Sequence, residues 1–130
     1  MDSESDYEYK ARKSFRCHSS EYAGITTVKG YQDVKPDSVD DLTLAASERV
    51  VSVAIEADKS VFQHYTGGVI TSSACGKKLD HGVAVVGYNA DAWIVRNSWG
   101  ANWGDQGYVQ IARNAENICG ILSDPSYPTM

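Results

Sequence analysis

The stretch Lys78–Tyr108, KLDHGVAVVGYNADAWIVRNSWGANWGDQGY, decides the fold of this 130-residue chain. It contains two apolar runs, His81 to Tyr88 and Ala92 to Asn97, which are rich in Val and Ile. The turn-forming residues Asn89 and Asp91 separate them. Two such runs on either side of a short polar segment are typical of a β-hairpin. The stretch therefore predicts two paired antiparallel strands at the centre of a domain.

The hairpin brings a histidine and an asparagine together. If the turn is centred on Asn89, His81 and Asn97 lie directly opposite one another, with Cβ atoms roughly 5 Å apart on one face of the sheet. The Asn oxygen can then accept a proton from one ring nitrogen and leave the other nitrogen free. In a nucleophile triad, a third residue orients the base in this way. Trp99, two residues after Asn97, is expected to keep water from the His81–Asn97 pair.

Two sequence blocks carry a family resemblance. DHGVAVVGY (residues 80–88) and WIVRNSWGANWGDQGY (residues 93–108) resemble the His and Asn blocks of papain-like cysteine proteases, in particular the cathepsin L-like branch. The resemblance extends from Tyr7 to Pro128. It implies an α+β fold, the β-rich right lobe of these proteases, with an antiparallel, open, barrel-like sheet and short helices. Residues 25–130 would form this right lobe, and residues 1–24 would be a remnant of the left lobe.

The resemblance also implies a reaction, for which the chain holds only part of the machinery. Peptide-bond hydrolysis by a thiol protease needs a thiolate, a His, a residue that orients the His, and an oxyanion hole. His81 and Asn97 match the family's catalytic His and Asn, and Trp99 matches the residue that shields them. The family's nucleophile block, a Gln followed by Gly-x-Cys-Gly-x-Cys-Trp, is absent from the sequence. We therefore expect a C-terminal fragment that is inactive alone and needs the Cys-bearing N-terminal lobe as its partner.

Two other readings compete with an enzyme fragment. A truncated homologue could act as a non-catalytic module that binds a protease, its propeptide or an inhibitor. The intact set of His81, Asn97 and Trp99 favours the enzyme fragment, because binding alone would not require it. A metal site on Asp80 and His81 is disfavoured, since adjacent strand residues point to opposite faces and no further spaced ligands follow. No metal or cofactor is expected.

Three cysteines make an odd count. In an oxidising compartment this indicates one disulfide and one thiol whose partner lies elsewhere. Three free thiols in a cytosolic protein are the alternative. The resemblance assigns the bridge to Cys75 and Cys119, and matches Cys17 to a family cysteine whose partner lies upstream. It also implies a lysosomal, vacuolar or secreted location for the full-length protease.

The resemblance carries over a set of substrate-binding residues. Leu79 and Asp80 match the cleft wall, Ala54 matches the main specificity pocket, and Trp103 matches the hydrophobic residue on the leaving-group side. Asp124 matches the bottom of the specificity pocket, where an acid would admit basic as well as apolar side chains, because a buried ammonium needs a paired charge. Asp124 could instead begin a turn in water, and Trp103 could be a core residue. Peptide substrates, the propeptide and cystatin-like inhibitors are the implied partners.

Composition narrows the remaining possibilities. The formal net charge is -5, with no basic stripe, which argues against a nucleic-acid partner. The apolar runs are far shorter than the roughly 20 residues that a membrane span needs. Residues 1–6 lack the basic and apolar regions of a signal peptide.

Local patterns predict the other elements. We expect strands over residues 24–34, 50–55 and 107–113, and a single helical turn over residues 60–65. The strand at 50–55 is nearly all apolar, which predicts that both of its faces are covered. A helix should begin at Asp37 or Ser38, because Ser38 and Asp41 have capping-box spacing. Its expected apolar face is formed by Val39, Leu42, Ala46 and Val50.

Overall fold

The computed structural model describes residues 2–10 and 12–130, and these form two compact units. The first unit comprises the described residues up to Tyr31 together with Pro128–Met130. The second unit is Gln32–Tyr127 and holds most of the regular structure. The predicted boundary between residues 24 and 25 separates the two lobes of the papain-like fold. The division into compact units does not test that boundary, so it stays a prediction.

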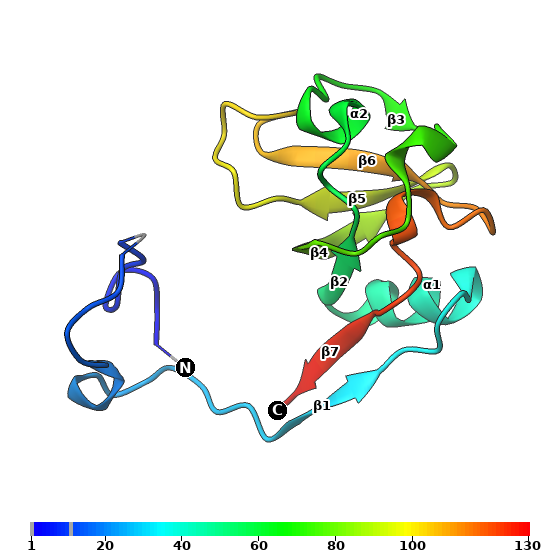
Figure 1. Ribbon diagram of the computed structural model, residues 1–130. Helices are drawn as coiled ribbons and strands as arrows, with labels where there is room; N and C mark the ends of the chain where they lie inside the picture. The colour runs from blue at the N-terminus through cyan, green and yellow to red at the C-terminus, as the bar shows by residue number, and fades with distance from the viewer. Residues whose placement is uncertain (1, 11) are drawn as a thin grey trace. The chain divides into compact units, whose positions relative to one another are not determined.

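The chain contains strands and short helices (Figure 1). The strands are β1 (Gly30–Asp33), β2 (Val51–Ile55), β3 (Val69–Ile70), β4 (His81–Tyr88), β5 (Ala92–Arg96), β6 (Tyr108–Ala112) and β7 (Ser126–Thr129). The α-helices are α1 (Val39–Glu48) and α2 (Ser60–Gln63), and the 3-10 helices are η1 (Ser19–Glu21), η2 (Ser73–Cys75) and η3 (Ile118–Gly120). None of the described helices is long and apolar enough to cross a membrane.

The strands form one sheet in the order β1-β7-β2-β4-β5-β6-β3. β4 pairs antiparallel with β2 and β5, and β5 pairs antiparallel with β6, whereas the short β3 pairs parallel with β6. The predicted α+β class with a mostly antiparallel sheet and short helices is therefore confirmed, as is the central hairpin. Neighbouring β2, β4, β5 and β6 carry the core between them.

The core lies on one face of these strands. Val51, Val53 and Ile55 of β2 are buried, as are Val83 and Val85 of β4. Fully buried side chains from the other elements complete the core: Leu42, Phe62, Trp93 and Ile111. Burial of this apolar surface is the main stabilising contribution to the unit, at roughly 25 cal/mol per Å² removed from water.

The strand at residues 50–55 differs from its expected burial. Along β2 the exposed Ser52 and the half-buried Ala54 alternate with three fully or nearly fully buried residues. An antiparallel strand of this kind covers the core with one face only. The prediction that both faces are covered was therefore wrong.

The helix begins as predicted and ends earlier. Ser38 is the N-cap, and its hydroxyl oxygen accepts from the backbone N–H of Asp41 at 3.2 Å. Val50 lies beyond the helix and is 54% exposed, so its predicted place on the apolar face was wrong. The first strand is also shorter than predicted, because only residues 30–33 of the expected 24–34 form β-structure.

Candidate active site

His81 and Asn97 contact each other at one end of the hairpin. His81 is the first residue of β4, and Asn97 follows the last residue of β5. His81 Nε2 lies 2.8 Å from Asn97 Oδ1, and Asn97 is buried with 7% of its surface exposed. His81 is half-buried, so the residue remains partly open to solvent.

Asn97 makes two further hydrogen bonds, one through its side chain and one through its backbone. Its Oδ1 also accepts from the backbone N–H of Ser98 at 2.8 Å, and its own backbone N–H donates to Gly107 O at 2.9 Å. Because an N–H donor already points at Oδ1, this atom is the acceptor, and His81 Nε2 must be the donor. In the neutral ring the proton then lies on Nε2, and the Nδ1 lone pair is left for chemistry.

A β-bulge in the hairpin sets the faces of these residues. Gly87 pairs with Ile94, whereas Val85 pairs with Val95, so Val86 is an extra residue on β4. Val86 is 38% exposed and points away from the core. A bulge of this kind changes which face every residue beyond it presents.

The bulge is what places His81 and Asn97 on the same face. Beyond it, Ala84 pairs with Arg96, and the same register continued by one residue puts Asn97 across from Val83. Val83 and His81 are two positions apart and share a face. If the pairing of Gly87 with Ile94 continued without a bulge, Asn97 would lie across from Ala84, whose side chain points to the opposite face.

The predicted register was therefore wrong, although the predicted contact forms. The turn lies at residues 90 and 91, because the backbone N–H of Asn89 donates to Ala92 O at 2.9 Å. His81 and Asn97 are diagonal neighbours and not directly opposed. Diagonal pairs lie within reach of long polar side chains, which is why the bond still forms.

An aromatic cluster stands beside the histidine. The Trp99 ring lies 5.0 Å from the His81 ring at an interplanar angle of 32°, and it is 41% exposed. Trp99 also meets Phe62 edge-on at 5.5 Å and Trp103 at 5.2 Å. The ring is positioned by this cluster, and its shielding role stays a prediction.

Trp103 is part of the same cluster. It is half-buried, its Nε1 donates to Gln63 O at 3.0 Å, and its ring lies 5.0 Å from that of Phe62. Packing and a polar anchor thus hold it between α2 and the loop after β5. Its predicted contact with the leaving-group side of a substrate is not tested by this arrangement.

The predicted pocket residues occupy the neighbouring strand ends. Ala54 pairs with Gly82 across β2 and β4, directly beside His81. Ser52 of β2 pairs with Ser126 of the antiparallel β7. Ala54 lies two residues after Ser52, and Asp124 lies two residues before Ser126. Ala54 and Asp124 therefore lie toward the same end of two antiparallel neighbours. The Asp124 side chain is exposed, which is compatible with both the pocket and the turn readings.

Leu79 and Asp80 differ in how they are held. Leu79 is 39% exposed. The Asp80 carboxylate accepts from the backbone N–H of Ala57 at 2.8 Å, so this side chain is engaged with the protein. Their predicted place on a cleft wall stays a prediction.

The predicted disulfide is present. Cys75 and Cys119 are bonded, both are fully buried, and their Cα atoms lie 4.8 Å apart. The bridge joins η2 to η3 and therefore anchors the segment that leads to His81. Cys17 is the free and exposed cysteine, and hydrogen bonds with Ser19 lower the pKa of its thiol.

Sequence reasoning missed Glu56, a residue that contacts the segment before His81. Glu56 is 4% exposed and follows the last residue of β2. An acidic residue directly after an apolar strand, with Lys59 three positions on, was the available signal. It was missed because such residues usually mark the solvated end of a strand.

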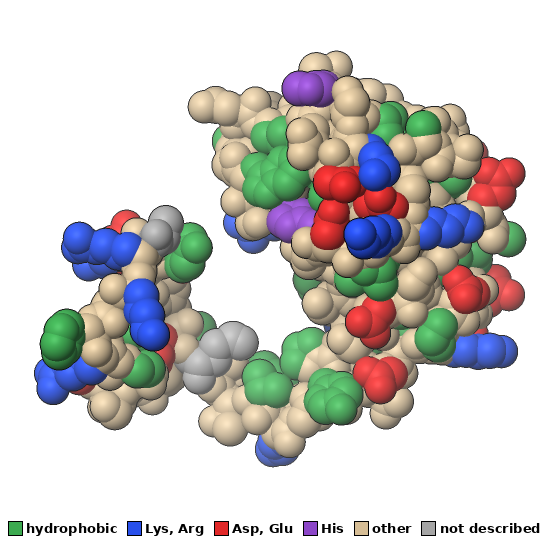
Figure 2. All heavy atoms as spheres, viewed as in Figure 1, with side chains coloured by type: hydrophobic (Ala, Val, Ile, Leu, Met, Phe, Trp, Pro, Cys, Tyr) green, Lys and Arg blue, Asp and Glu red, His purple; other side chains and the backbone are tan. Residues whose placement is uncertain are grey.

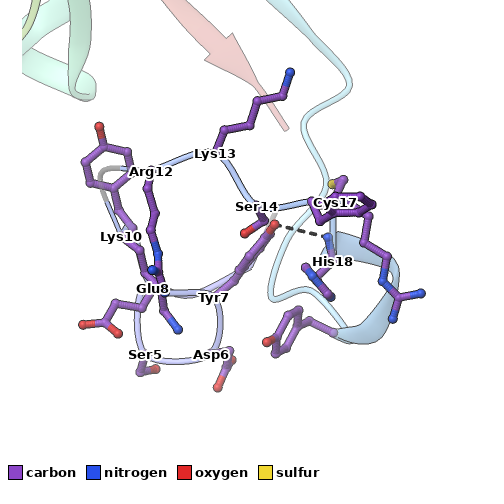
Figure 3. Close-up of a pocket in the computed structure, with 14 residues that line it drawn as sticks. Ser5, Asp6, Tyr7, Glu8, Lys10, Arg12, Lys13, Ser14, Cys17 and His18 are labelled. Atoms are coloured by element: carbon purple, nitrogen blue, oxygen red, sulfur yellow. Dashed lines mark hydrogen bonds between the residues drawn. The ribbon is translucent and has the colours of Figure 1, made fainter.

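A cavity of about 860 Å³ lies in the first unit (Figure 3). Its lining includes the basic side chains Lys10, Arg12, Lys13 and Arg16, and Tyr7 Oη accepts from the backbone N–H of His18 at 3.2 Å. It includes none of the predicted catalytic or substrate-binding residues. Among the described residues no group of three or more His, Cys, Asp or Glu side chains could hold a metal ion.

An orienting amide bonded to a half-buried imidazole, on a β-rich α+β unit, defines the candidate site. Residues 1–129 match the family described as papain family cysteine protease, so the chain belongs to that family. The chain is 45% identical to the Arabidopsis thaliana protein named "Probable cysteine protease RDL2", over 99% of the chain and 38% of the relative. It is 42% identical to a Caenorhabditis elegans protein named "Cathepsin L-like", over 98% of the chain and 40% of the relative.

Solved structures agree with this assignment. The bromelain protease from Ananas comosus, in complex with the E64 inhibitor, superposes with a TM-score of 0.89 at 35% identity, over 99% of the chain and 62% of that structure. The ragweed pollen allergen Amb a 11, a cysteine protease in its proform, superposes with a TM-score of 0.87 at 30% identity, over 98% of the chain and 41% of that structure. The chain thus spans about two fifths of the length of these curated relatives.

Proposed function

We propose that the chain supplies the His and Asn half of a papain-type endopeptidase active site. The observation that carries the proposal is the bond from His81 Nε2 to Asn97 Oδ1 at 2.8 Å, with Ser98 N–H holding the same oxygen. This arrangement leaves Nδ1 as the ring atom able to exchange a proton with a thiol. The chain needs a second lobe that brings the nucleophilic cysteine.

The reaction that fits this geometry is acyl transfer through a thioester. His81 Nδ1 takes the proton of the partner's thiol, and the thiolate sulfur forms a bond to the scissile carbonyl carbon. The imidazolium then returns its proton to the amine nitrogen as the C–N bond breaks. Water, deprotonated by His81, hydrolyses the thioester. Throughout, Asn97 Oδ1 holds Nε2–H and keeps the ring in one orientation.

None of the chain's own cysteines suits the nucleophilic role. Cys75 and Cys119 are joined to each other, and Cys17 has no Gln or Gly-x-Cys-Gly-x-Cys-Trp context around it. We therefore propose that the chain alone does not hydrolyse peptides. Cys17 is exposed, which supports a tether to a partner lobe through this thiol.

Substrate and setting follow from the same assignment. We propose peptide substrates bound along Leu79, Asp80 and Trp103, with Ala54 and Asp124 at the specificity pocket and basic side chains accepted there. Propeptide-like segments and cystatin-like inhibitors would compete for this surface. The buried Cys75–Cys119 bridge supports an oxidising, lysosomal, vacuolar or secreted setting.

Reconstitution tests the proposal. The chain is coexpressed with the Cys-bearing lobe of the Arabidopsis relative to give a reconstituted enzyme, which is assayed with a fluorogenic dipeptide and labelled with E-64. We expect hydrolysis and labelling by the complex, none by the chain alone, and loss of hydrolysis in His81→Ala. His64→Ala is the matched control, because His64 follows α2 outside the site and should leave activity unchanged.

The experiment also decides between the two functions left open. A complex that forms, binds a propeptide and yet shows no hydrolysis would overturn the enzyme assignment. It would support a non-catalytic binding module instead. Hydrolysis that survives His81→Ala would overturn the assignment of His81.

A further inference from the structure

A buried carboxylate sits next to the segment that leads to His81. Glu56 directly follows β2, and only 4% of its surface is exposed. A carboxylate removed from water is costly unless charges and hydrogen bonds are supplied to it. The hydrogen-bond and ion-pair partners of Glu56 therefore indicate the role of its side chain.

Two donors meet the Glu56 carboxylate. Oε2 accepts from the backbone N–H of Lys78, and Oε1 pairs with Lys59 Nζ at 2.9 Å. Lys59 is itself shared with Asp58, whose Oδ1 lies 3.0 Å from Nζ. The pKa of Glu56 is lowered, first by the Lys78 N–H and then by Lys59, so the carboxylate is charged at neutral pH. Figure 2 shows acidic and basic side chains close together on the visible face of the second unit.

The segment before His81 also binds the residues that follow β2. Asp80 Oδ1 accepts from the backbone N–H of Ala57 at 2.8 Å, and the backbone N–H of Asp80 donates to Ile55 O at 3.0 Å. The Glu56 carboxylate thus binds the segment before His81, and the Asp80 carboxylate of that segment binds the backbone just after β2. Because His81 directly follows Asp80, both contacts end within three residues of the imidazole.

Gly76 and the disulfide region restrict the position of Glu56. Gly76 packs against it so closely that a Cβ there would stand 2.1 Å from Oε2, and Gly76 has φ +77. The backbone N–H of Glu56 donates to Cys119 O at 2.8 Å, which ties the residue to the disulfide region. The Glu56 side chain therefore packs against Gly76 while the Glu56 backbone is bonded to Cys119.

We propose that Glu56 and Asp80 form a reciprocal carboxylate clamp that positions His81 for proton transfer. Its catalytic meaning rests on the proposed function, whereas its geometry stands without it. Glu56 is a positioning residue, since it acts on His81 through Lys78 and Asp80. A displacement of the imidazole by about 1 Å can cost up to about 100-fold in rate, so a clamp on the adjoining residues has a measurable effect.

The test uses three variants in the reconstituted enzyme. Glu56→Ala removes both bonds, Glu56→Gln keeps an acceptor for the Lys78 N–H, and Asp58→Asn removes the other carboxylate on Lys59. We expect kcat to fall about 10- to 100-fold in Glu56→Ala with little change in KM. Glu56→Gln should recover part of the loss, and Asp58→Asn should match the wild type.

Hydrogen exchange and NMR test the clamp independently of enzymatic activity. In Glu56→Ala the Lys78 amide should exchange at least about tenfold faster and the His81 ring signals should broaden, while the Val95 and Val109 amides keep their protection. If the Glu56→Ala chain does not fold, Glu56→Gln and Asp80→Asn take its place in both measurements.

The outcomes separate this inference from the function on which it rests. Unchanged kcat and unchanged Lys78 exchange in a folded Glu56 variant would overturn the clamp. Equal loss of protection at Lys78, Val95 and Val109 would also overturn it, because that pattern marks a general stability effect. An inactive wild-type complex would count against the proposed function, and the exchange result would still decide the clamp.

Discussion

One oxygen of Asn97 holds the His81 ring: Oδ1 lies 2.8 Å from Nε2 and also accepts from the Ser98 N–H. We expect Asn97→Ala to lower kcat of the reconstituted enzyme roughly 10- to 100-fold, because a hydrogen bond to a charged imidazolium is worth about 1.5–3 kcal/mol. KM should change less, since the bond acts on the ring and not on the substrate. Steady-state kinetics measures both constants.

Asn114→Ala is the matched control for this prediction. Asn114 lies in the loop after β6, and its Oδ1 accepts from the backbone N–H of Glu116 at 3.1 Å. It should leave kcat within about twofold of the wild type, as expected of a substitution away from the site. Equal kcat values in Asn97→Ala and wild type would contradict the orienting role.

The bulge at Val86 predicts that this residue can be truncated or deleted without separating His81 from Asn97. Val86→Ala keeps the extra residue, and because Val86 is 38% exposed the free energy of unfolding should change by about 0.5 kcal/mol or less. Deletion of Val86 removes the bulge but leaves Val85 across from Val95, so Val83 stays across from Asn97 and His81 stays on the same face. The ring signals of His81 should therefore keep the shifts that mark its bond to Asn97. Thermal unfolding and ¹⁵N spectra of the imidazole measure the two effects. A folded deletion variant that loses those shifts would refute this account of the register.

The hairpin and the His81–Asn97 contact could be predicted, because alternating apolar runs and turn residues are local signals. The register could not, since a single extra residue is invisible in a run such as Val83-Ala84-Val85-Val86. Burial of Glu56 was equally hidden, because its partner Lys78 is 22 positions away. β2 was expected to be covered on both faces, yet Ser52 is exposed, because composition alone does not say whether a strand's neighbours are antiparallel.

The disulfide predicts a large and specific loss of stability on reduction. Its cysteines are 44 positions apart, and the chain-entropy relation for a loop of that size corresponds to about 4 kcal/mol. We expect the Cys75→Ala, Cys119→Ala double variant to lose about 2–4 kcal/mol of unfolding free energy in urea titrations. Cys17→Ser should lose almost nothing, because Cys17 is exposed and unbridged. Identical urea midpoints for the wild type with and without reductant would contradict the prediction.

Glu56 also predicts how stability depends on pH. Its pKa is lowered in the folded chain by the Lys78 N–H and by Lys59, which is shared with Asp58. A group with a lowered folded pKa contributes stability above its unfolded pKa of about 4.3, and the contribution is lost as the pH falls through the folded pKa. The difference in unfolding free energy between wild type and Glu56→Gln should therefore be constant from about pH 7 to pH 5 and shrink below about pH 4. Urea titrations across this range measure it, with Asp58→Asn as the exposed-carboxylate control. A difference that grows as the pH falls would show that Glu56 is not held as a carboxylate.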